Sequence, residues 1–183
     1  MAMIVIFITG YACTGKSTLA KLICEKEQIG YISFHDEMSI HAKEKGFSKT
    51  RFLLKELGTK EFLATATTII ANKALENNTK HLIIDGLYNW EMFLKIEKLT
   101  HFKPHVIGIE SDRNIRVERM MTRMSDTLFN AERQIKLYDD FKDDFGIAEV
   151  MSKNDYRFAN NSSLKDAILT FQQIINTIRY GQQ

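Results

Sequence analysis

The feature that most constrains this chain is the segment GYACTGKS at residues 10–17, which fits the pattern G-x-x-x-x-G-K-[ST]. It follows a continuous run of β-branched and aromatic residues at 3–9, which is typical of a strand buried on both faces. It leads into Lys16–Glu27, where apolar residues recur at helical spacing. A glycine-rich turn between a buried strand and a helix directs backbone N–H groups at an anion. We therefore expect this loop to bind the phosphates of a nucleoside triphosphate.

Each residue type in the loop has an expected task. The glycines allow a tight turn, Lys16 should reach the β- and γ-phosphates, and the Ser17 hydroxyl should bind Mg²⁺. Cys13 is expected to contribute only its backbone. The residues predicted to contact the nucleotide are Gly10, Ala12, Cys13, Thr14, Gly15, Lys16, Ser17 and Thr18. The expected cofactors are ATP and Mg²⁺, and the loop alone does not distinguish ATP from GTP.

The rest of the chain alternates short apolar runs with amphipathic segments. Further strands are predicted at residues 31–34, 81–84, 105–109 and 155–158. Helices are predicted at residues 36–45, 51–57, 59–77, 112–124 and 130–144, and after Ser163, where an S-x-x-D pair forms a capping box. Alternating strands and helices predict an α/β, three-layer fold with a five-stranded, mostly parallel sheet. We expect one domain of 183 residues.

Two carboxylates follow predicted strands, where ligands bind in parallel α/β sheets. Asp85 comes after the strand at 81–84 and is the expected second Mg²⁺ position, with a turn residue as the alternative. Asp36 follows the strand at 31–34. It could orient or deprotonate an acceptor hydroxyl, with a helix N-cap as the alternative.

Four arginines fall on one side of the predicted helix at 112–124. At about 100° per residue, Arg113, Arg116, Arg119 and Arg123 lie within a third of its circumference. Like charges on one face repel unless an anion lies there. We therefore predict a short arginine-bearing lid at about 113–133, with a hinge or tip at 122–129. Arg119 and Arg123 would be catalytic, Arg116 would bind the nucleotide, and a solvated basic face is the alternative.

The charge and composition of the chain limit the expected binding partners and the expected cellular compartment. The formal net charge is +2 and no basic block stands out, so nucleic-acid binding is not expected. Two cysteines, Cys13 and Cys24, predict no disulfide framework, and a cytoplasmic, reduced protein is expected. No apolar run is long enough to span a bilayer, so no membrane partner is expected. The sequence does not address the oligomeric state.

Four segments carry a family resemblance. GYACTGKSTLA resembles the start of adenylate kinases and dephospho-CoA kinases, and HLIIDG resembles the strand that supplies their second acidic residue. DRNIRVERMMTR is similar to their lid arginine helix. DYRFANNSSLKDAI is similar to the dephospho-CoA kinase segment with an asparagine loop over the adenine. The resemblance implies a P-loop kinase fold and assigns Asn160 to the nucleotide.

A narrower resemblance concerns the acceptor side. The pairs Thr50-Arg51, Leu57-Gly58 and Asp85-Gly86 resemble P-loop kinase-like proteins that stand alone or are fused to deaminase domains. This implies that Arg51 contacts an anionic acceptor, in a helical acceptor region at about 36–78. Tyr88 is a candidate substrate contact, although core packing is the alternative.

The chain also departs from these families. Adenylate kinases place an arginine three residues after the aspartate of the second strand, where this chain has Ser39. They place another shortly after the Asp-Gly pair, where residues 87–90 here are Leu-Tyr-Asn-Trp. The His-Pro pattern of dephospho-CoA kinases is also absent. The donor side therefore matches these families better than the acceptor side.

These patterns predict an ATP- and Mg²⁺-dependent small-molecule kinase. Its partners would be a nucleoside triphosphate and a small acceptor, and its acceptor would be nucleoside-, nucleotide- or dephospho-CoA-like. The alternative is a P-loop NTPase that acts as a regulatory switch or nucleotide binder without a dedicated acceptor. The arginine helix favours the kinase, whereas the missing acceptor arginines favour the switch.

Overall fold

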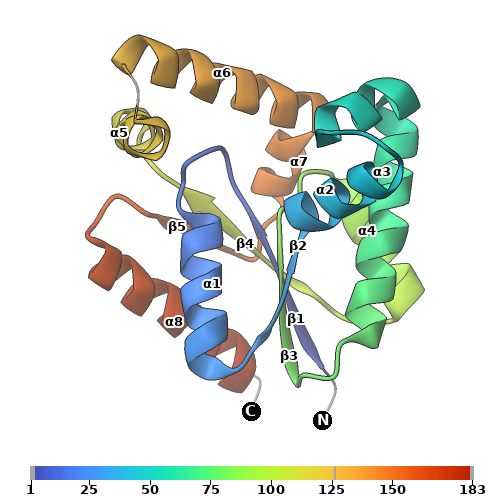
Figure 1. The fold of residues 1–183 in the computed structure, drawn as a ribbon. Helices are drawn as coiled ribbons and strands as arrows, with labels where there is room; N and C mark the ends of the chain where they lie inside the picture. The colour runs from blue at the N-terminus through green and yellow to red at the C-terminus, as the bar shows by residue number, and fades with distance from the viewer. Residues whose placement is uncertain (1–2, 126, 182–183) are drawn as a thin grey trace.

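Five short strands form one parallel sheet in the computed structural model, which describes residues 3–125 and 127–181 (Figure 1). The strand order is β2-β3-β1-β4-β5, and every neighbouring pair is parallel. The strands are β1 (Ile4–Thr9), β2 (Gly30–Ser33), β3 (His81–Asp85), β4 (His105–Glu110) and β5 (Tyr156–Ala159). Strand β1 lies between β3 and β4, so the order of the strands reverses beside it. Ligands bind at such a switch point, beyond the carboxyl ends of the strands.

Helices cover both faces of the sheet. They are α1 (Lys16–Glu27), α2 (Phe34–Glu44), α3 (Thr50–Glu76), α4 (Trp90–Thr100), α5 (Arg113–Met124), α6 (Leu128–Phe145), α7 (Ile147–Ser152) and α8 (Leu164–Tyr180). Helices α1 and α8 pack on one face. Helices α2, α3, α4 and α7 pack on the other, as Figure 1 shows.

The central strand β1 has both faces buried, as its unbroken apolar sequence predicts. Val5 and Phe7 point into the core under α3 and α4, whereas Ile6 and Ile8 point into the core under α1 and α8. All four side chains are at most 1% exposed. Because β1 is fixed on both faces, the loop that leaves its carboxyl end starts from a rigid position.

Helices α5 and α6 pack against each other around a small core of their own, made by Val117, Met120, Ala131 and Ile135. Figure 1 shows α6 crossing above the carboxyl ends of the strands. Helix α5 ends at Met124, followed by Ser125 in the left-handed region. The predicted tip at 122–129 includes residue 126, which lies outside the described residues. The pair nevertheless places the arginine helix above the phosphate loop.

The parallel α/β prediction is confirmed, and three details differ. The second strand ends at Ser33, and Phe34 starts α2 because the Ser33 side chain accepts a hydrogen bond from the Asp36 N–H and caps that helix. The two helices predicted at 51–77 form α3, interrupted only by non-helical geometry at Gly58. Helices α4 and α7 were not predicted. No helix within the described residues is both long and apolar enough to cross a bilayer.

Candidate functional site

The phosphate loop joins β1 to α1 and depends on two glycines. Gly10 and Gly15 have φ values of 145° and 88°. A Cβ added at Gly10 would lie 2.2 Å from the Ile109 carbonyl oxygen, and one at Gly15 would lie 2.4 Å from Asn160 Nδ2. The loop is therefore held tightly by β4 and by the segment after β5. Cys13 also has a positive φ of 59°.

Lys16 begins α1 and turns back over the loop. Its side chain is buried, and its Nζ donates a hydrogen bond to the Tyr11 carbonyl oxygen at 3.2 Å. Ser17 and Thr18 follow in the first turn of α1 and are exposed. The free N–H groups and the positive dipole end of this helix favour a bound anion. The strand–loop–helix arrangement expected for a phosphate site is therefore present.

Asp85 closes β3 beside the start of the loop. It is paired with Ile8 in the parallel register, and the next residue, Gly86, donates its N–H to the Ile8 carbonyl oxygen. The carboxylate is 4% exposed. Asp85 Oδ2 accepts a hydrogen bond from the Tyr31 hydroxyl at 2.9 Å, whereas Oδ1 is buried without a partner. An unpaired buried carboxylate oxygen fits a Mg²⁺ ion or its bound water.

An ion pair between a residue of α5 and a residue of α6 contacts the middle of the phosphate loop. Arg116 makes a bidentate contact with Asp139, at 3.1 and 2.6 Å. Arg116 also donates to the Ala12 carbonyl oxygen, and Asp139 accepts from the Ala12 N–H, both at 3.2 Å. Both backbone groups of Ala12 are thus satisfied by one buried ion pair. Sequence reasoning predicted Arg116 as a nucleotide contact and did not identify Asp139.

A second arginine ties the loop to the segment after β5. Arg119 donates to the carbonyl oxygens of Cys13 and Asn160, at 3.3 and 3.0 Å. Asn160 Nδ2 donates to the Thr14 carbonyl oxygen at 2.8 Å, and its buried Oδ1 has no partner. The structure therefore brings Arg119 and Asn160 together at the phosphate loop, where the sequence analysis places the nucleotide.

Burial and nearby carboxylates, which accept hydrogen bonds from the hydroxyl groups, raise the pKa of two tyrosines near the loop. Burial and the hydrogen bond to Asp143 raise the pKa of Tyr11 to about 12. Burial, followed by the charge of Asp85, raises the pKa of Tyr31 well above its usual range. Tyr31 is therefore a permanent hydrogen-bond donor to Asp85 and fixes the orientation of that carboxylate.

Lys142 of α6 is a site residue that sequence reasoning missed. Its buried Nζ donates to the Gly10 carbonyl oxygen at 2.8 Å and lies 5.1 Å from the centre of the Tyr88 ring. Tyr88 also packs edge-on against Phe34, and burial raises its pKa. A signal was available, because Ala131, Ile135, Lys142 and Phe145 follow one stripe of α6 at helical spacing.

Three predicted residues lie outside this cluster. Asp36 is exposed in the first turn of α2, with its carboxylate 3.9 Å from Lys21 Nζ. Arg51 is exposed at the start of α3, with its guanidinium 5.0 Å from the centre of the Phe52 ring. Arg123 is exposed in the last turn of α5. Within the described residues, none of the three makes a hydrogen bond to the phosphate loop.

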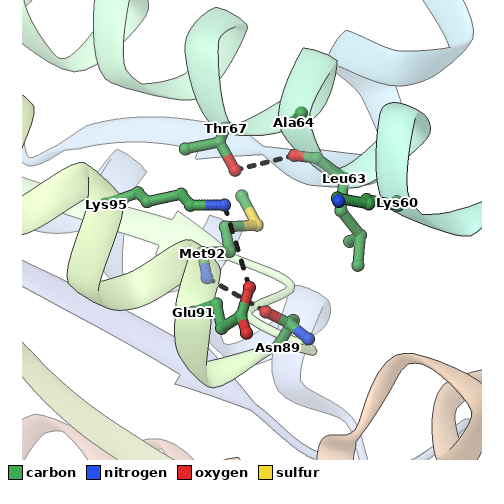
Figure 2. A pocket seen from close by; sticks show the side chains of 8 residues that line it. All are labelled: Lys60, Leu63, Ala64, Thr67, Asn89, Glu91, Met92 and Lys95. Atoms are coloured by element: carbon green, nitrogen blue, oxygen red, sulfur yellow. Dashed lines mark hydrogen bonds and ion pairs between the residues drawn. The ribbon is translucent and has the colours of Figure 1, made fainter.

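A small pocket between α3 and α4 is separate from this site. Figure 2 shows Lys60 and Thr67 on α3 facing Met92 and Lys95 on α4, with Lys95 paired to Glu91. Its volume is about 70 Å³, far below the roughly 300 Å³ at which ligand pockets begin. We therefore assign no ligand to this pocket.

Comparison with known proteins identifies the fold. No protein-family model and no curated protein matches the sequence. A shikimate kinase from Bacteroides thetaiotaomicron matches 96% of this chain and 99% of its own, with a TM-score of 0.63 and 16% identity. TT1252 from Thermus thermophilus matches over 96% and 97%, with a TM-score of 0.67 and 15% identity.

A third solved structure is a shikimate kinase from Acinetobacter baumannii in complex with shikimate. It matches 98% of this chain and 96% of its own, with a TM-score of 0.63 and 14% identity. Matches that span nearly the full length of both chains at such low identity establish a shared architecture. The chain therefore shares the parallel α/β fold of these solved structures.

Proposed function

We propose that this chain is an ATP- and Mg²⁺-dependent kinase that phosphorylates a small molecule. The observation that carries the proposal is the buried carboxylate of Asp85, whose Oδ1 has no partner beside the phosphate loop. A loop that only binds phosphate needs no such group, whereas phosphoryl transfer needs a metal ion held against the terminal phosphates. GTP in place of ATP is compatible with the same loop.

The donor-side roles follow from position. Lys16 would stabilise charge on the β- and γ-phosphates, and Ser17 and Asp85 would hold Mg²⁺, which neutralises phosphate charge when bound. Arg119 and Asn160, which donate hydrogen bonds to carbonyl oxygens of the loop, would contact the nucleotide. Arg116 would support the loop through Asp139 and contact the nucleotide from there. Arg123, from the lid at about 113–133, would reach the transferred group.

The acceptor-side roles concern the helical region at about 36–78. Asp36 follows β2, so it lies at the same edge of the parallel sheet as the phosphate loop. Its exposed carboxylate would orient the acceptor hydroxyl and accept its proton as the new O–P bond forms. Arg51 and Tyr88 would contact the acceptor's anionic and apolar parts. The acceptor we propose is nucleoside-, nucleotide- or dephospho-CoA-like.

Transfer to an acceptor can be separated from simple hydrolysis. The purified protein, with labelled ATP and Mg²⁺, would be given nucleosides, nucleotides, dephospho-CoA and shikimate. Shikimate belongs in the panel because one structure of similar fold was solved with it. We expect label to appear on one acceptor class and ATP consumption to rise with it. Phosphate release that no acceptor changes would instead support an NTPase switch.

Asp85→Asn should separate metal binding from stability. Asparagine retains an oxygen that can accept from Tyr31, and it removes a buried charge, so the thermal midpoint should stay the same or rise. ATP turnover should fall about 10²-fold, with a higher Mg²⁺ concentration needed for half-maximal rate. The control is Asp140→Asn, which alters an exposed carboxylate paired with Lys136. Unchanged Mg²⁺ dependence in Asp85→Asn would contradict the metal role.

A further inference from the structure

Two buried lysines from distant parts of the chain meet at the start of the phosphate loop. Lys16 of α1 and Lys142 of α6 are each 8% exposed. Lys16 Nζ donates to the Tyr11 carbonyl oxygen at 3.2 Å, and Lys142 Nζ donates to the adjacent Gly10 carbonyl oxygen at 2.8 Å. The two side chains thus donate to the carbonyl oxygens of consecutive residues. Within the described residues, neither is in an ion pair with a carboxylate.

Such a pair is costly in the protein by itself. A charge on both nitrogens costs free energy, because each ammonium would lose water, the two charges would repel, and backbone carbonyls would compensate only in part. Below Lys142 lies the Tyr88 ring, 5.1 Å from its Nζ, which holds the side chain in place without neutralising it. An anion that both nitrogens can reach would relieve the repulsion and satisfy the remaining N–H donors.

We propose that Lys142 is a second lysine of the phosphate site and contacts the terminal phosphate of the bound triphosphate alongside Lys16. The inference rests on the proposed function, because Lys16 is expected at the β- and γ-phosphates. Lys142 contacts Gly10, at the end of the loop that follows β1, whereas Arg119 and Asn160 contact the opposite end at Cys13 and Thr14. We therefore expect the terminal phosphate at the Gly10 end of the loop and the rest of the nucleotide at the other end.

The same geometry couples nucleotide binding to a proton. Burial and the neighbouring charge of Lys16 lower the pKa of Lys142, while Asp139 on the same helix and Asp85 on β3 act weakly in the opposite direction. A terminal phosphate beside Lys142 would raise that pKa again. Binding should therefore take up a proton, and the affinity for ATP should fall as the pH rises through the range of uptake.

The test compares ATP, ADP and inorganic tripolyphosphate by calorimetry, with EDTA present to exclude a metal contribution. In wild-type protein, titrations over a series of pH values in two buffers of different ionisation enthalpy should show net proton uptake with ATP and less with ADP. In Lys142→Met, ATP and tripolyphosphate should bind about 10- to 100-fold more weakly, ADP should bind nearly as before, and proton uptake should vanish.

The matched control is Lys136→Met, on the same helix but exposed and paired with Asp140, which should leave all three affinities unchanged. Equal loss of ATP and ADP affinity in Lys142→Met, or no proton uptake by the wild type, would overturn the proposal. The wild-type arm decides the question even if the variant does not fold. These measurements need no turnover, so a failed search for an acceptor would contradict the proposed kinase and leave this binding result standing.

Discussion

Lys16→Ala should abolish detectable ATP turnover while the protein remains folded. Lys16 donates its side-chain hydrogen bond to one backbone carbonyl and lies beside a second lysine, so its loss removes a repulsion as well as a contact. We therefore expect a thermal midpoint equal to or above that of the wild type. Turnover should fall by at least about 10²- to 10³-fold, because a positive charge at the transferred phosphate is lost. Steady-state phosphate release and a thermal melt measure the two effects.

Lys26→Ala is the appropriate control for this experiment. Lys26 lies in the last turn of the same helix, is exposed, and donates to Gln172 on α8 rather than to the loop. Its replacement should leave turnover unchanged. Full activity in Lys16→Ala would refute nucleotide binding by this loop, and a collapsed thermal midpoint would show that Lys16 is needed for folding.

The strand–loop–helix geometry of residues 4–27 was predictable because its sequence signal is local. The phosphate loop needs its glycines, lysine and serine at fixed spacing, so Gly10, Gly15, Lys16 and Ser17 identify it without tertiary information. The strands were predictable for a related reason. A parallel strand covered by helices on both faces must be apolar throughout, as β1 is.

Helix α4 was missed, since the sequence analysis predicts no element between residues 85 and 104. The helix signals were nevertheless present. Asn89 caps α4 by accepting from the Met92 N–H at 3.0 Å, and Met92, Phe93 and Ile96 form its buried stripe. Helix α7 is only six residues long and follows Gly146, which lies in the left-handed region, so its sequence pattern is weak.

The helical stripe of α6 could have marked Lys142 as facing inward, but sequence spacing does not show which part of the chain α6 packs against. Asp139 and Lys142 lie in a strongly charged stretch, DDFKDD, which is typical of a solvated helix face. Their burial depends on the packing of α6 over residues 10–13, more than 120 positions away in the chain. For the same reason Arg116, predicted from its stripe, could not be assigned to a buried ion pair in advance.

Neither sequence motifs nor local packing identify the residues that would bind an acceptor. Asp36 and Arg51 lie on successive elements, α2 and α3, which are joined by a hydrogen-bond contact of 3.1 Å between Ser39 Oγ and Thr50 Oγ1. Ser39 occupies the position where adenylate kinases carry an arginine. Here that position fixes one helix to the next and supplies no charge. If the chain acts on an acceptor as proposed, Ser39 cannot supply the charged contact that adenylate kinases make from this position.

Gly10→Ala should destabilise the fold itself, unlike the site variants above. The added Cβ would lie 2.2 Å from the Ile109 carbonyl oxygen, and the φ of 145° is one that alanine rarely adopts. Ile109 is fully buried in β4, which pairs with β1 up to Thr9, so that carbonyl cannot move without breaking strand pairing. Combined strain and overpacking should cost about 3 kcal/mol or more. Urea denaturation measures the loss.

Gly46→Ala isolates the backbone contribution, because Gly46 has a φ of 82° but no atom within 4 Å of an added Cβ. It should cost only about 1 kcal/mol. The difference between the two variants therefore reports the contact between the loop and β4. Equal losses would mean that this contact yields easily and that the loop is not held at the sheet edge. A much larger loss of stability in Gly10→Ala would mean that strand pairing holds the loop in place. The same pairing fixes the Gly10 carbonyl oxygen, to which Lys142 donates. The loop can therefore keep its shape beside two adjacent buried lysines.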